Sequence, residues 1–186
     1  MRTVIARIFD YSADGVVAEE DTDFFQYCRD LPDDPAQEAR TRRLYQDADL
    51  HIMGRKFYQG AGSYFPTATD HPYADLLNAG RKIVFSHTLR DAGWSNSVVT
   101  DGDLAEEVER LKQDGTGHIV AHGGYGFWQS LIRLDLIDEF RLTLFPYVVG
   151  QGRRLFGELE KSRPLELLSS NSFTNGCVEL EYRRAR

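Results

Sequence analysis

The fold class is decided by residues 48–56, which read Ala48-Asp49-Leu50-His51-Ile52-Met53-Gly54-Arg55-Lys56. Leu50 to Met53 form a short, mostly apolar run that predicts a buried strand. Other short segments rich in apolar and β-branched residues are Thr3 to Phe9, Lys82 to Ser86, Ser97 to Thr100 and His118 to His122. Strands buried on both faces are typical of a parallel sheet covered by helices. The sequence therefore predicts an α/β fold.

Amphipathic stretches between these segments supply the helices. The segment from Asp103 to Gly115 opens on a residue pair that resembles a capping box, repeats apolar side chains at helical spacing and stops at glycine. Tyr73 to Gly80 repeats this arrangement, and a third apolar stripe starts near Phe127. The turn-rich segment Leu31 to Pro35 is interpreted as a loop between two helices.

The last third of the chain alternates apolar and polar residues. Phe140, Leu142 and Leu144 alternate with Arg141 and Thr143, and Val178, Leu180 and Tyr182 alternate with Glu179, Glu181 and Arg183. Each segment should have one buried and one wetter face. Asn175-Gly176 is a strong hairpin signal before the second segment. The prediction is a mixed sheet, parallel at first and finished by antiparallel strands, in one domain of residues 1–186.

Composition narrows the possible partners. The 186 residues include 22 basic and 29 acidic side chains, a formal net charge of −7. This balance argues against broad nucleic-acid binding and against docking on an anionic membrane, since both need a basic surface. No apolar run approaches the roughly 20 residues that span a bilayer. Arg7 and Asp10 interrupt the N-terminus too early for a signal-peptide core. A soluble, cytoplasmic protein with a small-molecule ligand is predicted.

Neither cysteines nor histidines suggest a metal site. Cys28 and Cys177 belong to no C-x-x-C pair, so we expect buried or incidental thiols. His118 and His122 would face the same side of a strand, but four residues of strand separate them by about 13 Å. One zinc, with bonds of about 2 Å, cannot bind both. We expect no metal.

Three loops that follow predicted strands carry residues suited to a phosphate. The first, Met53 to Lys56, joins a glycine to two cations, although a solvated basic turn has the same composition. The second, Ser86 to Thr88, offers hydroxyls and an imidazole, or is a plain turn. The third, His122 to Gly126, places a glycine turn before a helix, as in a phosphate-binding nest, or is merely a tight turn.

With these loops, a series of short motifs resembles the dihydrofolate reductase-like superfamily. The branch most similar is the C-terminal reductase domain of the bifunctional riboflavin-biosynthesis deaminase/reductase. The matching elements are Ser12 to Gly15, Ala48 to Lys56, Lys82 to Leu89, Gly123-Gly124, Leu136 to Glu139, Pro146 and Gly150 to Phe156. Their order and spacing cover most of the chain.

The resemblance implies a three-layer αβα fold that binds NADPH across the strand ends. Arg55 and Lys56, with the Ser86 turn, would hold the 2′-phosphate end, so NADPH is favoured over NADH. The glycine turn would cradle the pyrophosphate, and Asp14 to Val16 would border the nicotinamide. The full set of predicted cofactor residues is Asp14, Gly15, Val16, Gly54, Arg55, Lys56, Phe57, Ser86, His87, Thr88, Gly123, Gly124, Tyr125 and Gly126.

Two departures from the family pattern bear on function. Phe57 stands where the family often has threonine after Gly-Arg-Lys, so one hydroxyl contact is missing. The acidic residue and the Pro-Trp pair of many dihydrofolate reductases have no clear counterpart, and only Asp21 and Asp23 lie in that region. Folate reduction is therefore disfavoured.

The leading hypothesis is an NADPH-dependent reductase that transfers a hydride to a small heterocyclic substrate, a pterin or a flavin-pathway pyrimidine. Asp23 is a candidate proton donor if burial raises its pKa, and a water is another. His122 either polarises a substrate carbonyl or donates a proton, or is a hydrogen-bonded structural histidine. The alternatives are a non-catalytic NADP(H)-binding or sensor domain and a structural interaction module. A homodimer is expected from the resemblance.

Overall fold

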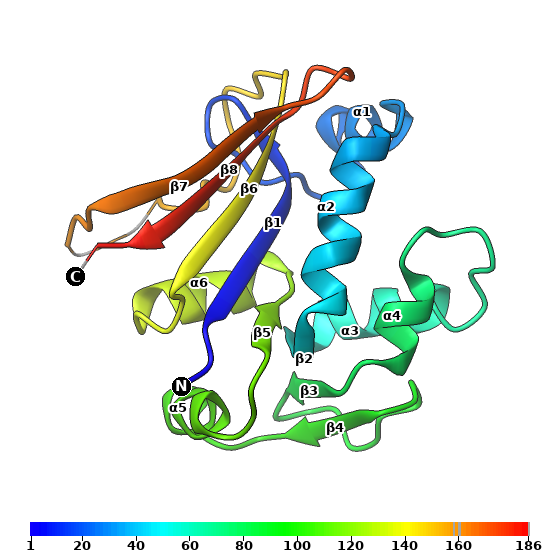
Figure 1. The fold of residues 1–186 in the computed structure, drawn as a ribbon, viewed down its shortest axis with the longest axis vertical. Coiled ribbons are helices and arrows are strands. Elements are labelled where there is room, and N and C mark those ends of the chain that lie inside the picture. Colours follow the sequence, from blue (N-terminus) through cyan, green and yellow to red (C-terminus); the bar gives the residue numbers. More distant parts are fainter. Residues whose placement is uncertain (158, 160, 186) are drawn as a thin grey trace.

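A computed structural model describes residues 1–157, 159 and 161–185 of the chain (Figure 1). The strands are β1 (Val4–Ser12), β2 (Ala48–Gly54), β3 (Lys82–Phe85), β4 (Ser97–Thr100), β5 (His118–Ala121), β6 (Glu139–Phe145), β7 (Leu165–Ser172) and β8 (Val178–Arg184). The helices are α1 (Asp23–Asp30), α2 (Pro35–Gln46), α3 (Arg55–Tyr64), α4 (Ala74–Ala79), α5 (Leu104–Gln113) and α6 (Tyr125–Arg133).

The strands form one mixed sheet in the order β4-β3-β2-β5-β1-β6-β8-β7. Neighbouring strands from β4 to β6 pair in parallel, whereas β8 pairs antiparallel with β6 and β7 antiparallel with β8. This confirms the predicted sheet that is parallel at first and antiparallel near the C-terminus. The hairpin predicted at Asn175-Gly176 joins β7 to β8, with Gly176 at φ +87°.

Helices cover both faces of the sheet, as expected for strands with two apolar faces. On one face α5 and α6 pack on alternate residues of β1, among them Val4, Ala6 and Ile8. On the other face α2, α3 and α4 pack on a cluster that contains Ile5 of β1 and Met53 of β2. The result is the predicted three-layer αβα arrangement (Figure 1).

Helix boundaries follow local signals. The Asp103 carboxylate caps α5 by accepting from the backbone N–H groups of Ala105 and Glu106, as the predicted start requires. The loop between two helices falls where expected, because α1 ends at Asp30 and α2 begins at Pro35. The third helix begins at Tyr125, two residues before Phe127. No helix in the described part of the chain is long and apolar enough to cross a membrane.

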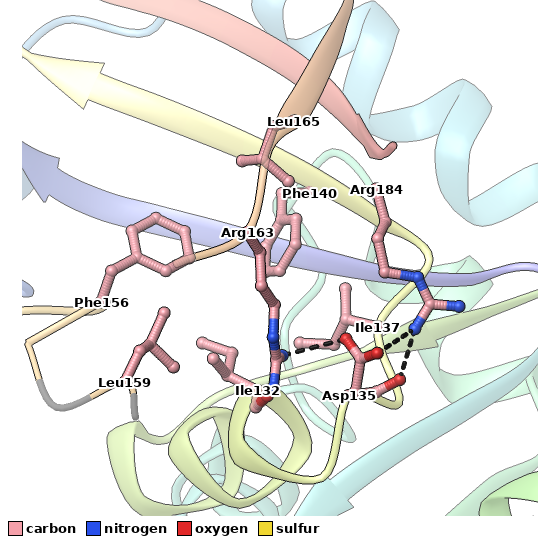
Figure 2. Close-up of a pocket in the computed structure, with 9 residues that line it drawn as sticks. All are labelled: Ile132, Asp135, Ile137, Phe140, Phe156, Leu159, Arg163, Leu165 and Arg184. Atoms are coloured by element: carbon pink, nitrogen blue, oxygen red, sulfur yellow. Dashed lines mark hydrogen bonds and ion pairs between the residues drawn. The ribbon is translucent and has the colours of Figure 1, made fainter. Parts of the chain in front are cut away.

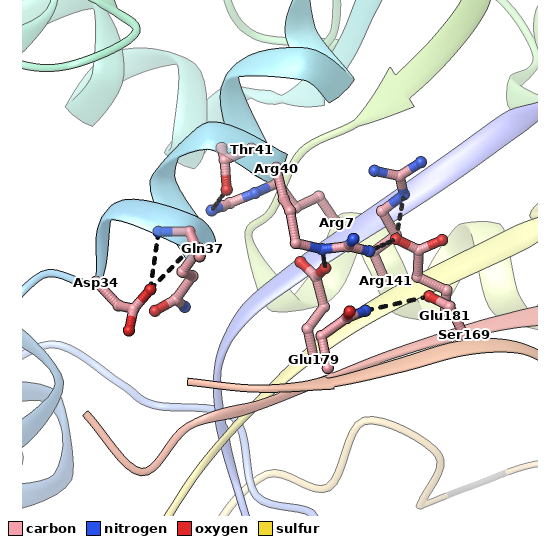
Figure 3. Close-up of polar contacts among 11 residues, drawn as sticks. Arg7, Asp34, Gln37, Arg40, Thr41, Arg141, Ser169, Glu179 and Glu181 are labelled. Atoms are coloured by element: carbon pink, nitrogen blue, oxygen red, sulfur yellow. Dashed lines mark hydrogen bonds and ion pairs between the residues drawn. The ribbon is translucent and has the colours of Figure 1, made fainter. Parts of the chain in front are cut away.

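The prediction that one face of the antiparallel strands is exposed to solvent is wrong at two positions. Thr143 and Glu179 are buried, whereas Leu144 and Leu180 are only partly buried. The reason is α2, which lies over this face and brings Arg40 to the sheet. Arg40 Nε donates to Glu179 Oε1 at 2.5 Å, and its Nη2 donates to Glu181 (Figure 3). Burial of Glu179 is tolerated because a cation from a distant part of the sequence pairs with it.

Strand β7 was not predicted, since its second half is Ser169-Ser170-Asn171-Ser172, a run with little β propensity. It lies at the edge of the sheet, so pairing with β8 alone holds it there. Its first half exposes Leu165, Leu167 and Leu168.

Candidate functional site

The loops chosen from the sequence meet at one edge of the sheet. Parallel strands β1, β2, β3 and β5 all end there, so the turns that follow them converge. Strands β2 and β5 are paired, but the helices that follow them pack on opposite faces of the sheet: α3 follows β2 on one face, and α6 follows β5 on the other. Such a divergence between neighbouring strands opens the crevice in which open α/β sheets bind ligands.

The two helices that start at this crevice lack the side-chain caps that α1, α2 and α5 have, as does the short helix α4 elsewhere. Side chains of Thr22, Asp34 and Asp103 accept from the first turns of α1, α2 and α5. By contrast, α3 and α6 start after Gly54 and Gly124, and neither has a side-chain cap. Their first backbone N–H groups are thus available to an anion, and the helix dipoles favour one.

Glycine is required at the base of each of these turns by close packing. A Cβ on Gly54 would lie 3.0 Å from Phe127 Cβ, and one on Gly123 would lie 2.9 Å from the Trp128 ring. A Cβ on Gly124 or Gly126 would meet open space. Gly54 and Gly123 therefore let the ends of β2 and β5 lie close to α6. Gly124 and Gly126 leave the outer surface of the turn accessible. The Gly123–Gly124 peptide bond is cis.

Basic side chains flank the open end of α3. Arg55 and Lys56 are exposed in its first turn, and Arg55 Nη1 makes one long contact, 3.5 Å, to Gln59 Oε1. Neither forms an ion pair within the part of the chain that the structure describes. Two exposed cations beside uncapped N–H groups match the requirements of a phosphate.

The turn after β3 is organised by Ser86. Its Oγ accepts from the backbone N–H groups of Thr88 and Leu89, at 3.2 and 2.9 Å, so the hydroxyl serves the turn itself. His87 and Thr88 are exposed. A cavity of about 160 Å³ beside this turn is lined by Ser86, Leu89, Arg90, Val99 and Asp101. Arg90 is a further cation that the sequence motifs did not single out.

Asp14 organises the loop after β1. Ser12 Oγ donates to it at 2.7 Å, and the backbone N–H groups of Val149 and Gly150 donate to it at 3.1 and 2.8 Å. The Ser12 hydroxyl, followed by these backbone groups, lowers the Asp14 pKa to about 2. Asp14 therefore ties this loop to the segment after β6 as a carboxylate.

The neighbours of Asp14 are held equally firmly. Gly15 has φ +85°, a conformation that favours glycine. Val16 is 2 % exposed and lies under Gly152, where a Cβ would come within 2.5 Å of Val16 Cγ1. The Val16 side chain thus packs inside the protein, and of Val16 only the backbone can face a ligand.

The glycine turn before α6 also has basic neighbours. The Arg153 guanidinium lies 5.3 Å from the centre of the Tyr125 ring, and the Tyr125 hydroxyl donates to the Arg154 carbonyl at 3.4 Å. Both arginines belong to the Gly150 to Phe156 motif, which sequence reasoning used for the resemblance but not for the site.

His122 is buried behind the glycine turn. It is 3 % exposed, its Nε2 lies 2.9 Å from His51 Nδ1, and its ring stacks on Phe57 with centroids 5.2 Å apart. Desolvation, with the charges of His51, Arg7 and Lys82, holds the His122 pKa well below its ordinary range. This arrangement favours the structural alternative for His122. It also gives Phe57 a role, because its ring supports the histidine that precedes the turn.

Asp23 lacks the burial on which its role as proton donor depended, since it is exposed at the start of α1. Asp10 has that environment. It lies at a register shift near the end of β1, with φ +44°. Desolvation raises its pKa to about 6, although Arg7 and Arg29 act in the opposite direction. An isolated aspartate in an irregular strand end gives no sequence signal.

A larger cavity, of about 220 Å³, lies away from this edge (Figure 2). Its lining residues are Ile132, Asp135, Ile137, Phe140, Phe156, Leu159, Arg163, Leu165 and Arg184. They come from the C-terminal end of α6, the start of β6 and β7 and the end of β8, so the cavity opens at the opposite end of β1 and β6 from the glycine turns. Asp135 pairs with both arginines there. Among the described residues, no three His, Cys, Asp or Glu side chains gather as metal ligands would.

Known proteins are similar to this chain in sequence and in fold. The family model of the RibD C-terminal domain matches residues 2–178. The uncharacterized protein YwjB of Bacillus subtilis is 30% identical over 179 residues, which are 94% of each chain. A putative riboflavin biosynthesis protein from Shewanella sp. PV-4 has 24% identity and a TM-score of 0.79, over 99% of each chain.

A dihydrofolate reductase from Enterococcus faecalis, complexed with NADP(H), has 15% identity and a TM-score of 0.64, and covers 99% of this chain and 97% of its own. The fold is thus dihydrofolate reductase-like, as the motifs implied. By the match over residues 2–178, the chain belongs to the family of the RibD C-terminal domain.

Proposed function

We propose that the protein is an NADPH-dependent reductase that transfers a hydride to a small heterocyclic substrate of the pterin or flavin-pathway pyrimidine type. The observation that carries this proposal is the pair of uncapped helix N-termini at the ends of the adjacent strands β2 and β5. A dinucleotide has two phosphates to place there and, in NADPH, a third for the cations. The NADP(H) complex of the structurally similar reductase supports this choice of cofactor.

Different residues of this chain would bind the cofactor, position the loop beside it and donate a proton. NADPH, when bound, supplies the hydride. The first N–H groups of α3 and α6 would bind the phosphates, and Arg55, Lys56 and Arg90 would favour the extra phosphate of NADPH over NADH. Asp14 fixes the loop that would border the nicotinamide. Asp10, whose pKa is raised to about 6 by burial, replaces Asp23 in our proposal as the proton donor.

Binding is measured through Trp94 and Trp128, both of which are buried. Trp128 packs against Gly123, so its fluorescence should report occupation of the glycine turn. We expect saturable quenching by NADPH, followed by oxidation of NADPH in the presence of a dihydropterin or an aminopyrimidine substrate. Absence of any binding at millimolar NADPH would rule the proposal out.

Replacing Arg55 with alanine should weaken NADPH binding about 10-fold and NADH binding much less, because the lost contact is to the 2′-phosphate. Thermal stability should be unchanged, since Arg55 is exposed and unpaired by any carboxylate in the described structure. The matched control is Arg81→Ala, which removes an exposed cation at the opposite end of β3. Equal losses for NADPH and NADH would contradict the assignment.

The alternative function is a non-catalytic NADP(H)-binding or sensor domain. Phe57, which occupies the usual threonine position and stacks on His122, favours it, since one polar contact to the cofactor region is replaced by packing. Tight NADPH binding without turnover on pterin, pyrimidine and quinone panels would select this alternative.

The predicted cellular location of the protein remains the cytoplasm.

We also propose a homodimer through β7. This strand is the sheet edge, and its unpaired backbone groups can bond to the same strand of a second copy about a twofold axis. Leu165, Leu167 and Leu168 are 36, 54 and 40 % exposed along it, and Leu165 also lines the larger cavity, so the apolar surface continues inward (Figure 2).

Leu167→Asp is expected to convert this dimer into a monomer, because it would bury a charge at the twofold contact. Light scattering coupled to size-exclusion chromatography gives the mass. The control Val98→Asp changes an equally exposed apolar residue on β4, at the other edge. A monomeric native protein, or a dimer that persists in Leu167→Asp, would contradict the model.

A further inference from the structure

Arg7 occupies a special position on β1. Its side chain points toward α2, on the same side of the sheet as Phe9, and it is only partly buried. Its guanidinium carbon lies 4.7 Å from the centre of the Phe9 ring and 5.8 Å from that of Tyr45. Arg7 Nη2 donates to Thr41 Oγ1 at 3.1 Å (Figure 3). Two aromatic faces and one hydroxyl therefore fix the guanidinium in place.

Neighbouring arginines on this side of the sheet have carboxylates within ion-pair distance, whereas Arg7 has none among the described residues. Arg40 pairs with Glu179 and Glu181, and Arg141 lies 3.7 Å from Glu181. Among the residues that the structure describes, no carboxylate forms an ion pair with Arg7. The charges of Glu179 and Asp10 act on Arg7 from beyond ion-pair distance. A guanidinium has five N–H donors, and the bond to Thr41 uses one of them, so Arg7 keeps donors for a further anion.

Two buried polar atoms on the α2 side of the sheet also lack partners. Gln37 precedes Thr41 by one turn of α2 and is 7 % exposed, and its Nε2 has no hydrogen-bond partner among the described residues. The buried Nδ1 of His71 has none either. Burial lowers the His71 pKa, and the charge of Arg7 lowers it further, which places the two side chains within electrostatic reach.

Contacts between rings connect Arg7 to the candidate cofactor site. Tyr45, which lies under the guanidinium, has its ring centre 5.5 Å from that of His122. His122 in turn stacks on Phe57 and precedes Gly123. Arg7 is thus separated from the glycine turn by two aromatic contacts, and Asp10 lies three residues further along the same strand.

We propose that Arg7 anchors an anionic oxygen group, a carboxylate or a phosphate, of the heterocyclic substrate and so selects charged heterocycles over neutral ones. This inference rests on the proposed reductase function. The guanidinium fork can donate to two oxygens of either group, and the Phe9 and Tyr45 rings keep the fork oriented before the ligand arrives. Arg7 is a specificity-determining residue in this view, and it takes no part in hydride transfer.

The test compares probes that differ only in charge. Calorimetry measures pterin-6-carboxylate against pterin for the carboxylate, and uridine monophosphate against uridine for the phosphate, each with and without NADP⁺. We expect one charged probe to bind at least about 10-fold more tightly than its neutral partner, and which pair shows the difference identifies the group. Equal affinities in both pairs, or no binding of the charged probes at millimolar concentration, would overturn the proposal.

Variants assign the effect to Arg7. Arg7→Met should abolish the preference for the charged probe, and Arg7→Lys should retain part of it, because a lysine keeps the charge without the fork. Arg42→Met removes a cation on α2 that Asp75 already neutralises, and it should change nothing. Persistence of the charge preference in Arg7→Met would overturn the proposal. If Arg7→Met fails to fold, full preference in Arg7→Lys would do so.

Cofactor binding separates this inference from the proposed function. Arg7→Met should bind NADPH with unchanged affinity by tryptophan quenching, since Arg7 contacts neither uncapped helix end. If the native protein binds no NADPH, the reductase proposal fails. The charged and neutral probes without cofactor still test Arg7.

Discussion

Replacing Asp10 with asparagine is expected to slow turnover by roughly 100- to 1000-fold while NADPH affinity stays the same, a loss typical of removing a general acid. Burial raises the Asp10 pKa to about 6, so below about pH 6 a protonated carboxyl is available to the substrate as it receives a hydride. Asparagine has nearly the same shape but no transferable proton. Single-turnover oxidation of NADPH, measured with a saturating dihydropterin or aminopyrimidine, gives the rate.

The pH profile provides a separate check on Asp10. A general acid works only when protonated, so the native rate should decline above about pH 6, and Asp10→Asn should lose this decline. The control is Asp30→Asn, an exposed aspartate at the C-terminal end of α1. If Asp23→Asn slows the reaction and Asp10→Asn does not, the donor is the one that the sequence suggested.

The central fold was predictable because local pattern and final environment agree there. Leu50 to Met53 and His118 to Ala121 are apolar on both faces, and the structure places them between helices on both sides. The prediction failed where partners come from a distance. Glu179 was expected to be exposed to solvent. It is buried instead, because Arg40, 139 residues earlier in the chain, pairs with its carboxylate.

In the candidate site, too, features set by local sequence were predictable and features set by distant parts of the chain were not. The glycines of residues 123–126 and the cations Arg55 and Lys56 were recognisable, since a strand, a turn and a helix start are contiguous in sequence. The raised pKa of Asp10, on which its proposed role depends, was not recognisable, because desolvation by the surrounding fold rather than any motif causes it. Arg7 likewise looks like an interruption of an apolar strand until the structure shows that no carboxylate pairs with it in the described chain.

Acid is expected to destabilise the protein strongly between pH 6.5 and 4, through the buried pair His51 and His122. Desolvation, with the charges of Lys82 and His118, lowers the His51 pKa to about 4, and the His122 pKa is also lowered. Unfolded histidines bind protons below about pH 6.5. In this window the unfolded state therefore binds more protons, and the free energy of unfolding falls as pH falls, by about 3 kcal/mol for His51 alone.

Urea unfolding at several pH values measures this loss. The double variant His51→Asn/His122→Gln should have a much flatter profile, even if its stability at pH 7 is lower. His87→Asn removes an exposed histidine and should keep the native slope. Parallel profiles for the native protein and the double variant would show that the pair does not control acid stability.

Asp10 opposes the histidine pair, and this opposition links the two predictions. Its pKa of about 6 lies above the ordinary 3.8, so between these values the folded state binds more protons and gains stability as pH falls. Two histidines acting in one direction outweigh one carboxyl acting in the other, which gives the net loss in the native protein. Asp10→Asn removes the opposing contribution. The variant that slows catalysis should thus be more stable at pH 7, where the native carboxylate is charged and buried, and should lose stability more steeply toward pH 4.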